Sequence, residues 1–145
     1  VGMSLRFDRI DNFWFVLRHE LEHVLRGDAK GEELTEVEPD SVGPTGVRES
    51  GAVAEQEQAA DTAASDFCVP REELDSFEAR VGRYFSKKKV QGFAQRVGVH
   101  PGLVVGQLHG RESLHPRNLR KFLVPIREYV TATAMTDGWG TVPQA

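Results

Sequence analysis

The sequence of 145 residues contains a single cysteine, Cys68, and no long apolar run. One cysteine excludes a disulfide framework within the chain and a metal site built from cysteines. The longest apolar run, 13–17, has five residues, whereas a membrane span needs about 20. The first residues also lack the charged-then-apolar pattern of a secretory signal peptide. We therefore expect a protein that has no contact with a membrane and works in a reducing, cytoplasmic compartment.

The chain also has little net charge, −4, but its charges are unevenly divided. Residues 1–78 carry 7 basic and 19 acidic residues, a net charge of −12, and residues 79–145 carry 11 and 3, a net charge of +8. Such a division is typical of a basic surface for nucleic acid or an acidic partner, and equally of two solvated faces that attract each other. Composition alone leaves both interpretations open.

Apolar residues recur at helical spacing through most of the chain. We expect helices over about 11–26, 53–68, 70–85, 87–98, 101–110 and 118–133. Asp11 or Asn12 is expected to cap the first helix, Gly27 to end it, and Ser86 to cap the fourth. Residues 28–54 are rich in Gly, Pro, Ser and acidic residues, which predicts a long loop with room for a short strand. A loop of that length is more often functional than not.

One motif stands out, His19-Glu20-Leu21-Glu22-His23, which matches H-E-x-x-H in the middle of the first helix. Four residues turn a helix by about 400° and raise it by about 6 Å, so both imidazoles share one face, one turn apart. Two neutral imidazoles placed in this way can bind one zinc ion, Zn2+. Glu20 would then face the metal-bound water and act as general base.

A zinc hydrolase needs a third protein ligand, which leaves the fourth position to water. Glu57 and Asp61 share one face of the next helix, where a glutamate can bind the metal and an aspartate can orient a ligand histidine from behind. Glu55 lies about 200° around that helix from Glu57, so only one of the two can face the metal. We favour Glu57 over Glu55 as the third ligand, because only Glu57 has an aspartate, Asp61, four residues later. Rival third ligands, all in the distant basic half, are His100, His109 and His115.

Three segments together resemble the ImmA/IrrE-type metallopeptidases: SLRFDRIDNFWFVLRHELEH, EQEQAADTAASDFCVP and FAQRVGVHPGLVVGQLHG. In that family an aromatic-rich run leads into H-E-x-x-H, and the second helix reads E-x-E-A-N/D before small residues and a closing Pro. Matching residues in the second helix are Glu57, Ala60, Asp61, Ala64 and Pro70. The resemblance covers about residues 4–125. This sequence departs from the family pattern at two positions. The family usually has Glu where this chain has Ala59, and Gly or Ala where it has Glu22.

The resemblance implies a zinc-dependent endopeptidase of mobile-element, toxin–antitoxin or stress loci that cleaves a helix-turn-helix repressor or antitoxin. It also implies zinc ligands at His19, His23 and Glu57, and a general base at Glu20. Family members usually have a strand-containing segment, and often a helix-turn-helix module, before the zinc helix. Only about ten residues precede that helix here.

The expected fold is a mainly α, zincin-like helical domain with a C-terminal helical subdomain. An α+β fold is the alternative, if the loop contains a small strand segment. Residues 1–80 are expected to form the metal-binding core and residues 81–133 a basic helical subdomain packed on it. Residues 134–145 are expected to form a flexible tail.

The basic half leaves a second function open, because residues 92–110 have the look of a helix-turn-helix with its turn at Gly98. Recognition helices display polar or Arg side chains to base edges, whereas the helix from Pro101 offers apolar residues such as Leu103 and Leu108. We therefore expect this helix to be buried and His100 to cap it. The alternative function is a non-catalytic regulator or antitoxin-type protein that binds DNA or a protein partner. As a partner, a protein substrate is favoured over DNA.

Overall fold

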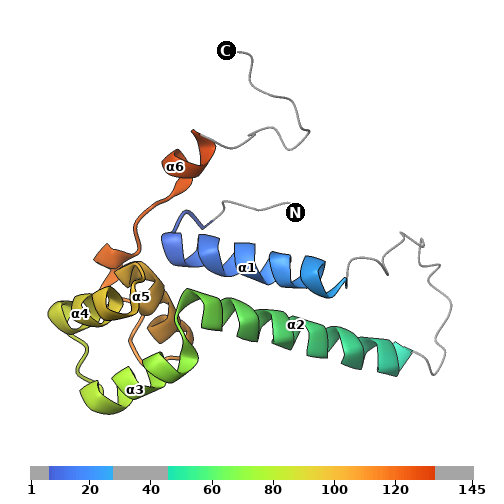
Figure 1. Ribbon diagram of the computed structural model, residues 1–145, viewed down its shortest axis with the longest axis horizontal. Helices are drawn as coiled ribbons and strands as arrows, with labels where there is room; N and C mark the ends of the chain where they lie inside the picture. The colour runs from blue at the N-terminus through green and yellow to red at the C-terminus, as the bar shows by residue number, and fades with distance from the viewer. Residues whose placement is uncertain (1–6, 28–45, 133–145) are drawn as a thin grey trace.

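The computed structural model describes residues 7–27 and 46–132, which form helices joined by turns and contain no strand (Figure 1). The helices are α1 (Ile10–Arg26), α2 (Gly46–Cys68), α3 (Arg71–Val81), α4 (Lys87–Val97), α5 (Pro101–Gly110), the 3-10 helix η2 (Arg120–Phe122) and α6 (Arg127–Thr131). For this part of the chain the prediction of a mainly α protein is confirmed. The expected tail 134–145, and residues 28–45 of the expected loop with its strand, lie outside the described residues. None of the described helices is both long enough and apolar enough to cross a membrane.

α1 and α2 lie side by side and antiparallel, and both extend away from the cluster of α3, α4 and α5 (Figure 1). On α2, Ala60 and Ala64 have no exposed surface, and they share a helix face with Glu57. Because alanine side chains are short, they allow the two helices to approach closely. α1 ends at Gly27, as predicted, with a φ of 76° that glycine adopts without steric cost.

The side of α1 toward α2 carries both histidines and Trp14, whose ring centroid lies 6.5 Å from that of Phe67. His19 and His23 contact α2 through Glu57. No residue of α1 is buried, and the side opposite α2 exposes Leu21 by 40% and Leu25 by 75%. α1 therefore contributes little to the hydrophobic core, and its place is determined mainly by its contacts with α2 and by those of its first turn.

The hydrophobic core lies among α3, α4, α5 and the turns that follow them. Its buried residues are Val69, Leu74, Phe77, Val90, Phe93, Ala94, Val104, Val105, Leu108, Leu114 and Phe122. Phe77 and Phe93 stack with their ring centroids 4.3 Å apart. This core is continuous across the expected boundary at residue 80, so α3 shares its apolar side with the helices that follow it.

α5 is the central helix, in contact with α1, α2, α4 and η2. Gly110 is the only one of its ten residues that is exposed. The predicted buried role of α5 is therefore confirmed, as is its cap, because His100 Nδ1 accepts a hydrogen bond from the Gly102 N–H at 3.0 Å. The Ser86 cap of α4 is confirmed as well, with Ser86 Oγ 3.2 Å from the backbone nitrogen of Lys89.

Close contacts with α5 and α6 hold the first turn of α1. A Cβ atom on Gly106 of α5 would collide with the side chain of Asp11, so the two helices touch at this point. Just before α1, Asp8 Oδ1 accepts hydrogen bonds from the backbone N–H groups of Ile126 (2.8 Å) and Arg127 (2.7 Å). These contacts position α1 at one end, and α2 contacts it along the rest of its length.

Four predictions about helix ends or continuity were wrong. α3 ends at Val81 and not at residue 85, because Gly82 has a φ of 61° that does not continue a helix. α2 begins at Gly46, about seven residues before the predicted start, because a helix that is exposed on most sides needs no apolar periodicity. α1 has Arg9 as its N-cap, and Asp11 pairs with the Arg9 side chain instead of capping. The predicted helix 118–133 is divided into η2 and α6, because Leu119 has a φ of 56° and Pro125 cannot donate a helical hydrogen bond.

Candidate metal centre

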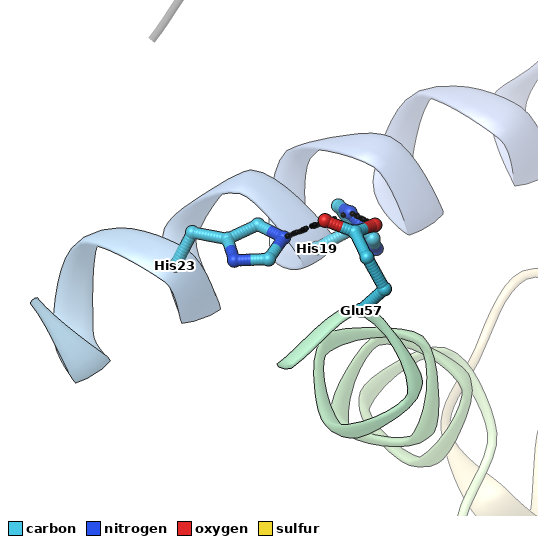
Figure 2. A group of neighbouring side chains, drawn as sticks. All are labelled: His19, His23 and Glu57. Atoms are coloured by element: carbon cyan, nitrogen blue, oxygen red, sulfur yellow. Dashed lines mark hydrogen bonds and ion pairs between the residues drawn. The ribbon is translucent and has the colours of Figure 1, made fainter. Parts of the chain in front are cut away.

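Two histidines of α1 and one glutamate of α2 converge between the helices (Figure 2). His19 Nε2 and His23 Nε2 are 3.1 Å apart. The Glu57 carboxylate reaches both rings, with Oε2 3.4 Å from His19 Nε2 and Oε1 3.3 Å from His23 Nε2. Each of the three side chains therefore presents one nitrogen or carboxylate group to a common point.

The spacing of these atoms fits a zinc ion. Zinc bonds of about 2.0–2.1 Å to nitrogen and oxygen, arranged as a tetrahedron, place neighbouring ligand atoms about 3.3 Å apart. His19 Nε2 and His23 Nε2 are 3.1 Å apart, and each lies 3.3–3.4 Å from a different oxygen of the Glu57 carboxylate. With one ligand atom taken from each residue, all three atoms lie within 4.8 Å of one another. Two histidines and one glutamate, with a fourth position left open, are also a donor set typical of catalytic zinc.

Asp61 lies behind His19, on the side away from the other ligand atoms. Its Oδ1 is 2.9 Å from His19 Nδ1. A neutral imidazole that donates through Nδ1 has its lone pair on Nε2, the atom that faces Glu57 and His23. The structure thus places Asp61 where sequence reasoning expected it, with a contact that orients the His19 ring.

Phe15 is a neighbour of the cluster that sequence reasoning missed. Its ring stacks with that of His19, with centroids 6.3 Å apart and an interplanar angle of 29°. The signal was available, because Phe15 precedes His19 by four residues and so lies one turn away on the same face.

Glu20 does not belong to the converging group. It follows His19 on α1, is half-buried, and makes no hydrogen bond or ion pair with another described residue. Glu55 is exposed and is not part of the cluster either, so the structure brings Glu57 and not Glu55 to the histidines. The rival histidines bond to nearby backbone groups: His100, His109 and His115.

The cluster is shielded on one side and open on the other. The side chains of His19 and His23 are 16% and 19% exposed, whereas that of Glu57 is 54% exposed. The ring nitrogens are therefore largely protected from solvent, while water or a substrate can approach along the carboxylate.

Glu22, where the sequence departs from the family pattern, is held by two arginines of its own helix. Its carboxylate lies 2.7 Å from Arg18 Nη2 and 3.0 Å from Arg26 Nε. Hydrogen bonds from Arg26 and then Arg18 hold the pKa of Glu22 below its ordinary value. The Arg18 guanidinium in turn lies over the Phe67 ring of α2, 6.0 Å from its centroid. A carboxylate at this position is thus part of the contact between the helices.

Comparison with models of protein families, with curated proteins and with solved structures finds no match to this chain. The resemblance to the ImmA/IrrE-type metallopeptidases therefore remains a prediction from its motifs.

Proposed function

We propose that this chain is a zinc-dependent endopeptidase, with His19, His23 and Glu57 as the metal ligands. The observation that supports this function best is the convergence of these three groups, one ligand atom from each lying within 4.8 Å of the others. The contact between Asp61 and His19 Nδ1 adds the outer hydrogen bond that metal-binding histidines usually have.

Zinc bound at this position would polarise the carbonyl of a peptide bond and lower the pKa of a water molecule. Within the chain, Asp61 keeps the proton of His19 on Nδ1, so that Nε2 remains a ligand atom. Glu20 takes the proton of the attacking water and delivers it to the amine nitrogen that leaves. Its carboxylate is suited to this role because no ion pair with a described residue occupies it.

We propose a helix-turn-helix repressor or antitoxin as the protein substrate, on the basis of the family resemblance, and the cytoplasm as the place of action. Cys68, the only cysteine, is free and buried, which fits a reducing compartment. Direct reading of DNA by α5 receives no support from the fold, since Gly110 is the only exposed residue of that helix.

Glu20→Gln tests this function, because the amide is nearly isosteric with the carboxylate but cannot accept the proton of water at neutral pH. The variant should bind one zinc ion per chain, as the parent does, and cleave a repressor encoded beside it at least about 100-fold more slowly. Zinc is measured by elemental analysis, and cleavage is followed by mass spectrometry. Glu72→Gln, at an exposed carboxylate of α3, is the matched control and should cleave normally.

Activity should also be measured in cells, as release of a promoter controlled by that repressor. A peptidase loses this effect in the Glu20→Gln variant even when the protein accumulates normally. A protein that only binds DNA or a partner needs no base beside the metal. If the Glu20→Gln protein acts in cells as the parent does, the peptidase function is wrong and the non-catalytic alternative replaces it.

A further inference from the structure

A groove of about 1050 Å3 lies between α1, α2 and α5. Phe15 of α1, Thr62 of α2 and Leu103 of α5 are among the residues that line it. Two lining residues also contact the candidate metal centre, since Phe15 stacks with His19 and Asp61 bonds to His19 Nδ1. The groove therefore begins directly beside the metal ligands.

Carboxylates outnumber arginines along this groove. Six carboxylates line it: Asp11, Glu22, Glu55, Asp61, Asp66 and Asp75. Only three arginines do, namely Arg26, Arg71 and Arg111. Each of these arginines already has a carboxylate partner. Arg26 pairs with Glu22 at 3.0 Å, and Arg71 pairs with Asp75 at 3.9 Å. Arg111 pairs with both Asp75 and Glu78. Outside the lining, Arg9 pairs with Asp11 and Arg18 with Glu22. Among the described residues, the lining carboxylates that have no arginine side chain as partner are therefore Glu55, Asp61 and Asp66.

Glu55 and Asp66 are the two carboxylates of α2 that remain for a ligand. Both are exposed, and neither forms an ion pair with a lysine or arginine in the described part of the chain. Asp66 accepts only the backbone N–H of Arg71, at 2.9 Å, whereas Asp61 is engaged by His19.

The two carboxylates are spaced for an extended polypeptide. Eleven residues of α-helix separate Glu55 from Asp66, which is about 16 Å along the axis. An extended chain covers that distance with about five residues. Asp61 falls within this interval and lines the groove, whereas Glu57 is not among the residues that line it. A chain lying along the groove would therefore pass Asp61, which bonds to the metal-centre residue His19.

We propose that this groove binds an extended, cationic segment of the substrate polypeptide, with basic side chains at Glu55 and Asp66. The inference rests on the proposed function and adds the chemical class of the substrate. Phe15 and Leu103 offer apolar surface to the aliphatic stems of lysine and arginine side chains, whose charged ends reach the carboxylates. Charge complementarity of this kind determines which partner binds and how fast it associates.

Binding of two fluorescent decapeptides to the full chain tests the inference. Both peptides are built from Ala and Ser, one with two lysines four positions apart, so that both lysines lie on one face of the extended chain, and the other with two glutamates at the same positions. Fluorescence anisotropy is measured at low salt with a chelator present, so that neither zinc nor cleavage contributes. The lysine peptide should bind at least about tenfold more tightly than the glutamate peptide, and its affinity should fall as salt is added.

Matched double variants show whether the groove causes this preference. Glu55→Gln/Asp66→Asn removes the two groove carboxylates and keeps an oxygen that can accept the Arg71 N–H. This variant should bind the lysine peptide about five- to tenfold more weakly. Glu72→Gln/Glu128→Gln removes the same charge at two exposed positions outside the groove and should change affinity by less than about twofold. Equal losses in the two variants, or no preference for lysine, would overturn the inference, because net charge alone would then explain the data.

The outcomes also separate this inference from the proposed function. If the chain binds zinc and cleaves a repressor but the lysine peptide has no advantage, the cationic groove is wrong and the peptidase function stands. If the groove variant loses lysine-peptide binding while neither zinc binding nor cleavage is found, the peptidase function is wrong. The groove then stands as a binding site for cationic peptides.

Discussion

The position of each acidic residue around α2 determines whether its side chain contacts the histidines of α1. Glu55 and Glu57 are two residues apart, so they lie on different sides of the helix. In the structure Glu57 contacts both His19 and His23, whereas Glu55 lines the groove. Asp61, one turn after Glu57, reaches the other nitrogen of His19.

This difference predicts unequal effects of two alanine substitutions on zinc affinity. Glu57→Ala removes one of the three proposed ligands, so it should weaken zinc binding by more than about 100-fold, beyond what a change behind a ligand usually causes. Glu55→Ala removes a carboxylate of the same chemistry only two residues away and should leave affinity within about threefold. Competition with a fluorescent zinc chelator measures both constants. A larger loss in the Glu55→Ala protein would show that the wrong side of α2 has been assigned to the metal.

The single cysteine takes no part in this chemistry. Burial, and to a smaller degree the charge of Asp11, raise the pKa of the Cys68 thiol to about 11. Because the thiolate is the form that binds metals and attacks electrophiles, Cys68 is an inert apolar residue at neutral pH. Its side chain contributes to the contact between α2 and its neighbours.

At the scale of elements, the site depends on how closely α1 and α2 approach. Ala60 and Ala64 are fully buried although they lie outside the hydrophobic core of α3, α4 and α5. They follow Glu57 by three and seven residues, so they share its side of α2. The short side chains that bring the helices together thus also bring the carboxylate to the histidines.

A larger side chain at this contact should therefore affect both stability and metal binding. Ala64→Leu should lower the free energy of unfolding by about 1–3 kcal/mol, because overpacking forces the helices apart. It should also weaken zinc binding, since Glu57 moves away from the rings. Urea unfolding of the metal-free protein and zinc titration measure the two effects. Ala79→Leu, at an exposed position of α3, is the control and should change neither. Unchanged zinc affinity in the Ala64→Leu protein would contradict this account of the contact.

At the scale of the whole molecule, part of the uneven charge is used internally. Acidic residues of α3 pair with arginines of the basic half, Glu73 with Arg96 at 2.7 Å and Glu78 with Arg111 at 2.8 Å. The interpretation of two faces that attract each other therefore has support in these contacts. Exposed ion pairs of this kind each contribute little to stability.

The carboxylates of Asp8 and Glu22 should make the free energy of unfolding depend on pH. Backbone N–H groups of Arg127 and then Ile126 lower the pKa of Asp8, as the two arginines lower that of Glu22. A carboxylate with a lowered pKa in the folded state stabilises the fold at pH values above its unfolded pKa. That contribution is lost as the pH falls through the lower, folded value.

The free energy of unfolding of the metal-free protein should therefore be steady from pH 7 to about pH 5 and fall below about pH 4. Asp8→Asn should reduce this loss, because the amide does not titrate, and should lower stability at pH 7. Glu72→Gln, at a carboxylate without such contacts among the described residues, should keep the dependence of the parent. Urea unfolding at pH 7, 5, 4 and 3 measures the curves. Identical slopes for the parent and Asp8→Asn would exclude Asp8 as a source of acid sensitivity.

The sequence by itself determined those features that depend on neighbours a few residues apart. The caps at Ser86 and His100 and the end of α1 at Gly27 follow from the local chain. The shared face of His19 and His23 follows from the period of the helix alone. The same period places Glu57 and Asp61 on one side of their helix.

Only the tertiary structure decided which sides of these helices meet. The apolar residues of α1 predict a buried face, yet no residue of α1 is buried and Leu25 is 75% exposed. The contact of Glu57 with two rings on another helix and the groove beside Asp61 also depend on how the helices pack. Each depends on packing between segments more than thirty residues apart or on the space left between helices. Helix periodicity orders the side chains within one segment, but it does not determine where a second segment lies.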